Sequence, residues 1–492
     1  MRPWLRFLLA LGCVSLLGLM TFGGVARIDL ELFTEHPAAG VPAHAELVTY
    51  PGPDGIPASN EYAVTVMQDG IQKDSFVYLV HAQKPDSNRS KSTSWTTFSL
   101  SGAVTVSVKK LQGSFQTCKI LPTSRGITPI IHGDTVEFAL DRPAKIAVEF
   151  DGHITHPMLV FADPLEDNIP SPNDPNVIYF GPGVHDIGAG FTVESGKMVY
   201  IAGGAYVKGQ LTGEDRRNVS IRGRGILSGE NLTPGGPHLI HLYGPKTQNA
   251  LVEGITMIQA AHYNVLLSGR GNTVRNVKMI SWLFCTDGVG VGRDGLVEDC
   301  FFKVNDDSIK LYQSNMTVRR CVIWQLENGA PFQISWNMPT DNAGFRISDC
   351  DVIRCEHRWN NRNCAIFDAI HGGPGHMSDY VFENIRIENA HWRLVRLTME
   401  KTKWSIQHKD YGQISQLVFR NVTVDGSMAN TNIIRGHDRE HRISNVLFEN
   451  VKVDGKCLTS AEDGNFEIDP QSADGIRFVA AEEQRGEGIE NP

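Results

Sequence analysis

Three aspartates in the middle of the chain have a spacing that suits acid–base chemistry. Asp306 and Asp307 are adjacent in VNDDSIKLY, and Asp287 precedes them by nineteen and twenty residues in FCTDGVGVG. Each acid heads a run that alternates polar and apolar residues, as a half-buried strand does. Clustered carboxylates repel one another and raise the pKa of at least one member, which makes it a proton donor near neutral pH.

Alignment of the two strands places Asp287 beside Asp307 on neighbouring coils. Two groups of residues then share the outward face, namely Gly288, Gly290 and Gly292 on one strand and Ser308, Lys310 and Tyr312 on the next. Glycines inside a strand cost stability and pack nothing. The glycine strip therefore predicts the floor of a groove in which a ligand approaches the backbone.

Glycoside hydrolysis uses such carboxyl groups, because one protonates the leaving oxygen and a second acts on the other face of the sugar. Side chains on neighbouring coils can supply the separation of roughly 6.5 to 9.5 Å that leaves room for a water molecule. That separation predicts inversion of the anomeric centre. The competing interpretation is structural, since Asp and Asn are common in turns, where they bond to backbone groups.

A repeated element must position these acids. A degenerate motif of alternating apolar residues recurs as VEGITM at Val252, VRNVKM at Val274, VEDCFF at Val297, VRRCVI at Val318, ISDCDV at Ile347, FENIRI at Phe382, FRNVTV at Phe419 and FENVKV at Phe448. A period in the low twenties with variable insertions predicts a solenoid of parallel strands. We expect an all-β fold with a right-handed parallel β-helix, a pectate-lyase-like solenoid, as the catalytic domain over residues 166–480.

Residues 27–165 contain short alternating stretches separated by Gly, Pro, Asp and Ser turns, the pattern of a β-sandwich domain. We expect this sandwich to cap the amino-terminal coil of the solenoid, because an uncapped coil exposes its interior and a free strand edge. Residues 1–26 are typical of a signal peptide, with Arg2 and Arg6 before an apolar stretch that ends at about Met20. They predict secretion to the extracellular space or periplasm, and no stable membrane partner unless the signal is retained as an anchor.

The net charge and the cysteine and histidine content limit the kinds of partner and cofactor that we expect. The chain has 492 residues and a formal charge of −9 without long runs of one sign, so nucleic acid is not expected as a partner. No cysteine or histidine spacing is typical of a zinc site, and neither a metal nor another cofactor is expected. Cys300, Cys321 and Cys350 share one position of the repeat, which predicts an inward ladder of buried thiols or one disulfide. We expect a monomer whose partner is its polysaccharide substrate.

CTDG followed by NDDSIKLY, inside a β-helix preceded by a sandwich, resembles the family 49 glycoside hydrolases, the dextranases and isopullulanases. The resemblance to family 28 polygalacturonases is more distant. The resemblance to family 49 implies that Asp306 is the general acid and that Asp287 and Asp307 hold and deprotonate the attacking water. It also implies that the anomeric centre is inverted. The Gly-His-Gly and Arg-Ile-Lys of the polygalacturonases are missing, which favours a neutral α-glucan, dextran-like or pullulan-like, as substrate.

Further residues are predicted to bind the substrate. They are Lys310, Tyr312, Gln333, Trp336 and His371, and Trp359, Trp392 and Trp404 are additional candidates for stacking on sugar rings. Gln333 belongs to the outward face of the third strand, and His371 lies in the glycine-rich stretch DAIHGGPGH, which we expect at the rim. Two other functions stay open: hydrolysis of another polysaccharide such as polygalacturonan, and non-catalytic binding of glycans by a β-helix.

Overall fold

The computed structural model describes residues 45–84, 88–358 and 363–480, which all belong to one compact unit, Ala43–Pro492. The predicted signal peptide, residues 1–26, lies outside the described part of the chain. Among the described residues, the helical content is the single 3-10 turn η1 (Thr123–Arg125), and no helix is long and apolar enough to cross a membrane. The expectation of an all-β fold is confirmed.

The first part of the chain forms two sheets. A 6-stranded sheet contains β1 (Glu46–Thr49), β4 (Val77–His81), β5 (Ser92–Ser101), β7 (Cys118–Leu121), β10 (Ala144–Phe150) and β11 (Met158–Pro164). A 5-stranded antiparallel sheet contains β2 (Tyr62–Gln68), β3 (Ile71–Ser75), β6 (Val104–Lys110), β8 (Ile130–His132) and β9 (Thr135–Leu140). Inward residues of both sheets, such as Val66 and Val148, meet in one buried cluster, so the alternation predicted for this segment forms the core of a sandwich.

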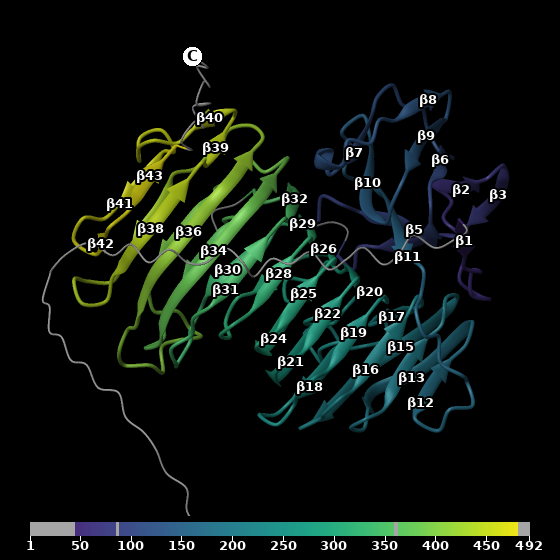
Figure 1. Cartoon of the computed structure of the whole chain (residues 1–492), viewed down its shortest axis with the longest axis horizontal. Helices are drawn as coiled ribbons and strands as arrows, with labels where there is room; N and C mark the ends of the chain where they lie inside the picture. The colour runs from purple at the N-terminus through teal and green to yellow at the C-terminus, as the bar shows by residue number, and fades with distance from the viewer. Residues whose placement is uncertain (1–44, 85–87, 359–362, 481–492) are drawn as a thin grey trace, which may run out of the picture. The chain divides into compact units, whose positions relative to one another are not determined.

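The rest of the chain forms a 32-stranded sheet that winds as a parallel β-helix (Figure 1). One ladder of stacked strands contains β12 (Val177–Phe180), β14 (Met198–Ile201), β16 (Ser220–Gly223), β19 (Leu251–Glu253), β22 (Thr273–Arg275), β25 (Leu296–Glu298), β28 (Thr317–Arg319), β31 (Phe345–Ser348), β34 (His376–Ile387), β36 (Gln413–Val424), β38 (Ile443–Glu449), β42 (Ala473–Asp474) and β43 (Arg477–Val479).

A second ladder lies beside it and merges with it at β34 and β36. It contains β13 (Gly183–Thr192), β15 (Ala205–Glu214), β17 (Ile226–Ser228), β20 (Thr256–Ile258), β23 (Lys278–Ile280), β26 (Phe301–Val304), β29 (Val322–Gln325), β32 (Asp351–Cys355), β39 (Lys452–Val453) and β40 (Lys456–Cys457).

The third ladder, called the site ladder below, carries the three aspartates at the heads of its strands. It starts from the end of β15 and contains β18 (Ile240–Tyr243), β21 (Val265–Arg270), β24 (Val289–Arg293), β27 (Ile309–Lys310), β30 (Phe332–Ser335), β33 (Phe367–Ile370), β35 (Val395–Thr398), β37 (Asn432–Arg435) and β41 (Phe466–Ile468). The loops between ladders absorb the variable insertions of the repeat.

The sequence repeat corresponds to the coils of the solenoid. Val252 pairs with Val274, Val274 with Val297, and the same register continues through all the predicted positions to Phe448. The last members form a stack of rings, with centroids 5.1 Å apart for Phe382 and Phe419. Equivalent residues of neighbouring coils are therefore neighbours in space, as strands roughly 4.8 Å apart require.

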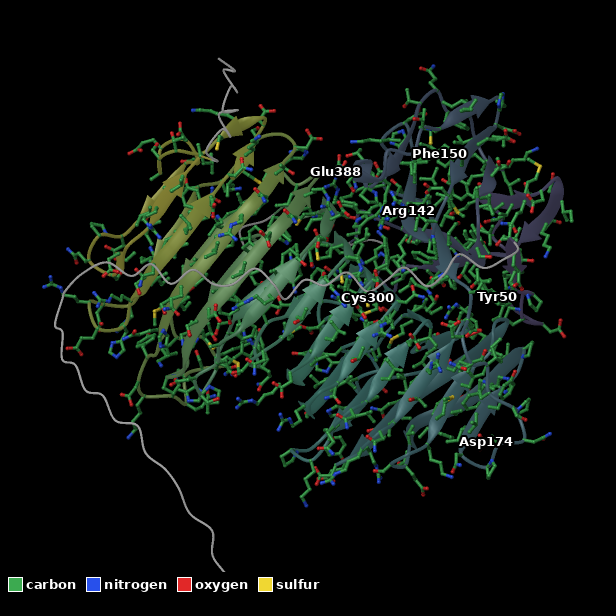
Figure 2. All side chains as sticks on the ribbon, viewed as in Figure 1. Tyr50, Arg142, Phe150, Asp174, Cys300 and Glu388 are labelled. Atoms are coloured by element: carbon green, nitrogen blue, oxygen red, sulfur yellow. The ribbon has the colours of Figure 1, made fainter. Side chains whose placement is uncertain are left out.

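The cysteine ladder predicted from the repeat lies inside the solenoid. Cys300, Cys321 and Cys350 are fully buried in its core cluster, and all three are free thiols. The side chains of the described residues are drawn in Figure 2, where Cys300 is labelled. Of the two interpretations of the ladder, the stack of buried thiols is the one that the structure shows.

The sandwich packs along the side of the solenoid, and the expectation that it caps the amino-terminal coil is wrong. A buried cluster joins Trp95 and Phe161 of the sandwich to outward side chains of successive strands of the second ladder, from Tyr206 in β15 to Ile353 in β32. The rings of Phe161 and Phe301 are 5.1 Å apart. These outward positions are apolar because another sheet covers them, a relationship that no local pattern encodes.

Charged groups also join the sandwich to the solenoid. Asp163 of β11 is fully buried, and its carboxylate accepts a hydrogen bond from Lys278 Nζ of β23 at 2.7 Å. Near the site, Asn305 Nδ2 lies 3.4 Å from Asn88 Oδ1 of the sandwich. The boundary expected near residue 165 falls between β11 and β12; that the two parts are separate domains stays a prediction.

Candidate active site

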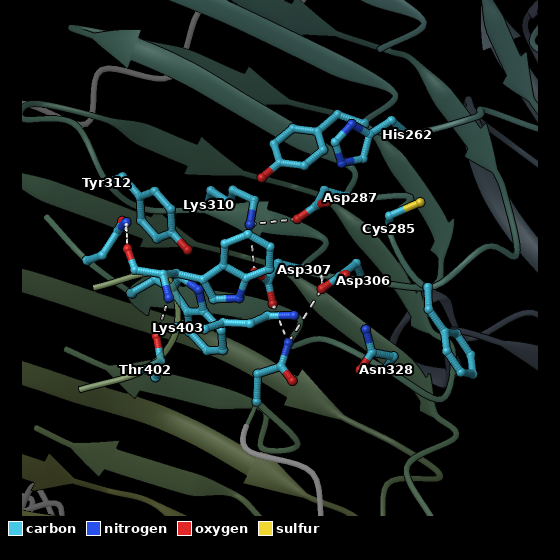
Figure 3. A pocket seen from close by; sticks show the side chains of 16 residues that line it. His262, Cys285, Asp287, Asp306, Asp307, Lys310, Tyr312, Asn328, Thr402 and Lys403 are labelled. Atoms are coloured by element: carbon cyan, nitrogen blue, oxygen red, sulfur yellow. Dashed lines mark hydrogen bonds and ion pairs between the residues drawn. The ribbon is translucent and has the colours of Figure 1, made fainter. Parts of the chain in front are cut away.

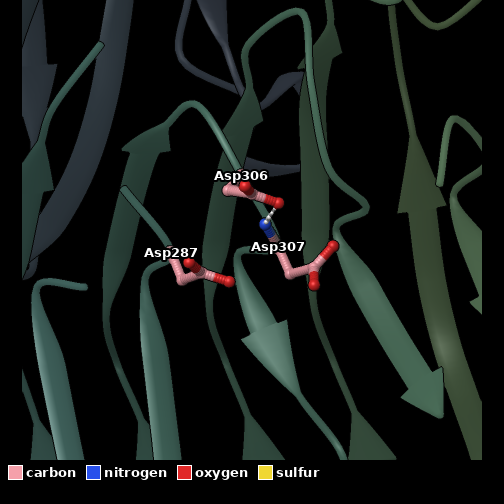
Figure 4. Close-up of side chains that lie close together, drawn as sticks. All are labelled: Asp287, Asp306 and Asp307. Carbon is pink, nitrogen blue, oxygen red and sulfur yellow. Dashed lines mark hydrogen bonds between the residues drawn. The ribbon is translucent and has the colours of Figure 1, made fainter. Parts of the chain in front are cut away.

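The three aspartates meet at the heads of two neighbouring strands of the site ladder (Figure 4). Val289 pairs with Ile309, and the backbone N–H of Gly288 donates to Asp307 O at 3.0 Å, so Asp287 lies beside Asp307 on the preceding coil. Carboxylate oxygens of Asp287, Asp306 and Asp307 lie within 4.8 Å of one another. The common register of the two strands therefore produces the cluster that the sequence predicts.

The turn that holds Asp306 and Asp307 is fixed by the next coil. Gly329 has a φ of +82°, and a Cβ there would lie 2.1 Å from the backbone carbon of Asp306, so a side chain at this position would displace the acids. Gln325 Nε2 donates to Asp306 O at 2.9 Å. The backbone N–H of Ala330 donates to Asp307 Oδ1 at 3.1 Å. The carboxyl groups are thus held in position before any ligand binds.

Lys310 supplies the positive charge of the cluster. Its Nζ atom lies 2.6 Å from Asp287 Oδ1 and 2.7 Å from Asp307 Oδ2, and the side chain is almost fully buried. Burial alone would lower the pKa of Lys310, but the two carboxylates raise it well above its ordinary value. The two carboxyl groups therefore favour the charged form of Lys310, whose ammonium group lies between them.

Asp306 differs from its neighbours in lacking a cation. No ion pair between described residues involves Asp306, and its Oδ1 accepts a hydrogen bond from the backbone N–H of Asp307 at 3.0 Å. Burial and the charges of Asp287 and Asp307 raise the pKa of Asp306 well above its usual range. Burial also raises the pKa of Asp287, to about 7, although Lys310 opposes the rise. Asp306 is therefore the member of the cluster best suited to carry a proton.

The three carboxyl groups lie close together. One carboxylate oxygen from each aspartate lies within 4.8 Å of the other two. Asp307 directly follows Asp306, and Asp287 is one strand spacing away. The separation of roughly 6.5 to 9.5 Å that is typical of inverting glycosidases refers to whole carboxyl groups, so the distance between the closest oxygens favours neither inversion nor retention.

A cavity of about 840 Å³ opens over the aspartates (Figure 3). Its lining residues are His262, Tyr263, Phe284, Cys285, Asp287, Asp306, Asp307, Lys310, Tyr312, Asn328, Trp336, Asn337, Asn363, Thr402, Lys403 and Trp404. Of the predicted substrate-binding residues, Lys310, Tyr312 and Trp336 line it. A large cleft that combines aromatic walls with a few convergent polar groups is typical of a ligand site.

Gln333 and His371 do not line this cavity. Both are fully buried. The segment between β35 and β36 packs next to His371, since a Cβ at Gly372 would lie 2.1 Å from Ser405 Oγ. Trp404 O of that segment accepts a hydrogen bond from Asn337 Nδ2 at 2.8 Å. His371 bonds to Ser335 Oγ and to Gly375 O, each at 2.7 Å, and burial lowers its pKa to about 4. Gln333 faces outward as expected, but other residues cover that face.

Trp404 lines the cavity, as one of the additional stacking candidates, and its side chain is 52% exposed. Trp392 does not line it, and Trp359 lies outside the described residues.

The sequence argument missed several residues of the cavity. Tyr263 stands one coil before Asp287, since Val265 pairs with Val289, so the repeat register could have identified it. The Nζ atom of Lys310 lies 5.1 Å from the centroid of the Tyr263 ring. Asn363, whose Nδ2 donates to Asp307 Oδ1 at 3.2 Å, comes from a distant insertion that gave no signal.

The three aspartates are close enough to ligate a metal ion, although no metal was expected. Lys310 already occupies the position between Asp287 and Asp307 from which a cation would neutralise them. A divalent ion at that position would be repelled by the ammonium group. The residues present fit acid–base chemistry better than metal binding.

The chain is similar to dextranases and to an isopullulanase. It is 28% identical over 227 residues to a dextranase of Arthrobacter sp. (strain CB-8), a match that covers 39% of this chain and 35% of the relative. It is 24% identical over 377 residues to an isopullulanase of Aspergillus niger, covering 62% and 66%. Its fold is similar to that of Dex49A from Penicillium minioluteum, with a TM-score of 0.71, 21% identity and coverage of 88% and 96%. No family model matches the chain.

These matches confirm the resemblance expected from CTDG and NDDSIKLY, and the structural match confirms the predicted fold class. The chain spans about a third of the length of the dextranases that it matches.

Proposed function

We propose that this protein is a glycoside hydrolase that cleaves an α-glucan of the dextran or pullulan type. The observation that carries the proposal is the cluster of Asp287, Asp306 and Asp307 around Lys310, at the bottom of a large cavity with aromatic walls. The similarity to dextranases and an isopullulanase supports the choice of substrate.

Asp306 serves as the general acid in this proposal. Burial and the neighbouring aspartates raise its pKa, which favours the protonated form that a general acid requires, and it is the least buried of the three aspartates. A proton donated to the glycosidic oxygen allows the bond to the leaving sugar to break without release of an alkoxide. After this step Asp306 is a carboxylate, which the neighbouring aspartates destabilise by repulsion. A proton taken up from water then restores the acid form of Asp306.

Asp287 and Asp307 hold and deprotonate the attacking water. Asp307 accepts hydrogen bonds from Lys310, from the backbone N–H of Ala330 and from Asn363, which fix the orientation of its carboxyl group. A carboxylate with so many donors is a weaker nucleophile but still an acceptor for water. Water loses one proton to this pair as its oxygen bonds to the anomeric carbon.

We propose inversion on this basis. Proton NMR of a dextran or pullulan digest during the first minutes, before mutarotation, tests the proposal. A β-anomeric product from the α-linked polymer supports inversion. An α-anomeric product would instead require a covalent intermediate on one of the aspartates.

A neutral glucan suits the charges of the cavity better than a polyuronate does. The ammonium of Lys310 is already paired with two of the three aspartates, and carboxyl groups at the bottom of the cavity would repel the carboxylates of a polyuronate. The aromatic walls, including Tyr312 and Trp336, suit the flat apolar faces of sugar rings.

The test is a reducing-sugar assay of the purified protein on dextran, pullulan and polygalacturonate. Release from dextran or pullulan is the expected result. Release from polygalacturonate alone would contradict the substrate, and binding of glycans without release from a broad panel would favour a non-catalytic binding protein. Export of the enzyme is proposed from the sequence of the amino terminus, and a monomeric state is a further proposal.

A further inference from the structure

A cavity between the sandwich and the solenoid, called the joint cavity below, lies apart from the aspartates. It has a volume of about 310 Å³. Its lining residues come from η1, β10 and the end of β11, and from the first two ladders of the solenoid with the turns between them. None of them lines the cavity over the aspartates. A cavity of this size has room for a small ion together with water molecules.

Basic side chains outnumber acidic ones in the joint cavity. Six basic and four acidic residues line it, and the basic ones are Arg125, Lys145, Arg222, Arg224, Arg275 and Arg320. The four arginines of the solenoid all form ion pairs with acidic residues. The excess of positive charge therefore lies with the two basic residues of the sandwich, Arg125 and Lys145.

Arg125 has no ion-pair partner in the described part of the chain. It is the last residue of η1 and is half-buried. Burial lowers the pKa of Arg125, although Asp351 and Asp299 oppose this change. Asp351 already binds Arg386 at 2.9 Å. Asp299 likewise binds Arg320 at 2.8 Å. Because an arginine side chain stays charged in proteins, this guanidinium group lacks a counter-ion of its own.

Lys145 is a second cation with unused hydrogen-bond donors. Its side chain is 9% exposed, and its Nζ atom lies 3.9 Å from Oδ1 of Asp163, too far for a hydrogen bond. Asp163 already accepts a hydrogen bond from Lys278 at 2.7 Å. The ammonium group of Lys145 donates no hydrogen bond to a described residue, although its side chain lines the joint cavity. A buried charge is costly without such bonds, and an anion in the cavity would accept them.

We propose that the joint cavity binds a small tetrahedral oxyanion, phosphate or sulfate, between Arg125 and Lys145. The guanidinium group can donate parallel hydrogen bonds to two oxygens of such an ion, and the ammonium group can bind a third. The arginines of the solenoid wall add positive potential. Because the ion contacts the sandwich on one side and faces the solenoid on the other, it binds the folded chain and stabilises it. This site is separate from the proposed hydrolysis.

The test is isothermal titration calorimetry of sodium phosphate, and then of sodium sulfate, into the purified protein in a chloride buffer. We expect the wild type to bind one ion per chain. Arg125→Ala should weaken binding by about tenfold or more, because hydrogen bonds between charged groups are lost. Arg142→Ala is the matched control and should bind as the wild type does. Arg142, labelled in Figure 2, is an exposed arginine of the sandwich that pairs with Asp141 and does not line the joint cavity.

Melting temperatures guard against a folding defect. In chloride, Arg125→Ala should be as stable as the wild type, since the substitution leaves no acidic group without its partner. Phosphate at the same ionic strength should then raise the Tm of the wild type more than that of Arg125→Ala. Comparison of the two proteins in one salt removes the general stabilising effect of phosphate and sulfate on folded proteins.

Lys145→Met removes the other sandwich cation and is the second variant. A loss of affinity in either folded variant, with Arg142→Ala unaffected, supports the site. The site is overturned if the wild type shows no saturable binding of either ion, or if the wild type and both variants bind with equal affinity. Either of these results would leave the hydrolase proposal intact.

Discussion

The Nζ atom of Lys310, in β27, lies 2.7 Å from Oδ2 of Asp307, three residues earlier in the chain. This contact places a positive charge beside a buried carboxyl group whose neighbours are also carboxyl groups, an arrangement that repulsion would otherwise oppose. The same ammonium reaches Asp287 on the preceding coil. Lys310 therefore distinguishes the two aspartates assigned to water from Asp306, which forms no ion pair with a described residue.

Lys310→Met is expected to abolish most activity. Lys310 lowers the pKa of Asp287, so its removal leaves that carboxyl protonated at neutral pH and unable to accept a proton from water. A loss of about 10²-fold or more in kcat is expected. Steady-state kinetics on dextran, with Lys109→Met as a control at an exposed ion pair, provides the measurement. Near wild-type kcat in folded Lys310→Met would refute the role of the ammonium group.

The pH profile of kcat/KM is expected to be bell-shaped. Activity falls as the pH drops through about 7, because Asp287 becomes protonated there. It also falls at higher pH, as Asp306 loses its proton. Because the groups lie so close, both limbs report the cluster as a whole. A rate that is independent of pH from 5 to 9 would exclude this pair of roles.

Asp306→Asn is expected to stabilise the protein, and more so at higher pH. The pKa of Asp306 is raised above its ordinary value of 3.8, so its contribution to stability is fully present below that pH and is lost as the pH rises through the folded-state pKa. Asparagine has no such proton to lose. The difference in Tm between variant and wild type should therefore grow from pH 4 to pH 8. A difference that shrinks over this range would show that the carboxylate is stabilising.

Asp163→Asn is expected to destabilise the contact between the sandwich and the solenoid. Asp163 is fully buried, with Lys278 at 2.7 Å, and the variant leaves this buried ammonium group without an ion-pair partner among the described residues. Breaking a buried pair in this way costs about 3–5 kcal/mol. Guanidinium denaturation measures the change, with Asp134→Asn as the exposed control, for which no shift of the midpoint is expected. The same small shift in both variants would disprove the claim.

The fold and the aspartate cluster were predictable because both follow from a repeat. Val252, Val274 and their successors occupy one position per coil, and this register alone places Asp287 beside Asp307. The alternation of polar and apolar residues also identifies Gln333 as outward. It contains no information about what covers that face, so the burial of Gln333 and His371 required the structure.

Relationships between distant segments were not predictable for the same reason. The sandwich packs against outward residues such as Phe301. This contact depends on how the surfaces of two sheets fit together, which the sequence of neither sheet indicates. Asn363 reaches Asp307 from an insertion outside the repeat. The stacking of His238 on His262, with ring centroids 4.5 Å apart, also had no signal in the sequence, because nothing in the repeat indicates that these two histidines lie side by side.

The assignment of Asp306 as the general acid is tested most directly by the rate at which folded Asp306→Asn releases reducing ends from dextran or pullulan. The amide keeps the size of the carboxyl group but cannot donate its proton, so kcat should fall by about 10²- to 10⁴-fold. Asp425→Asn, at an exposed position, is expected to retain the wild-type rate. A folded Asp306→Asn protein that cleaves the polymer at a near wild-type rate would remove Asp306 from the mechanism.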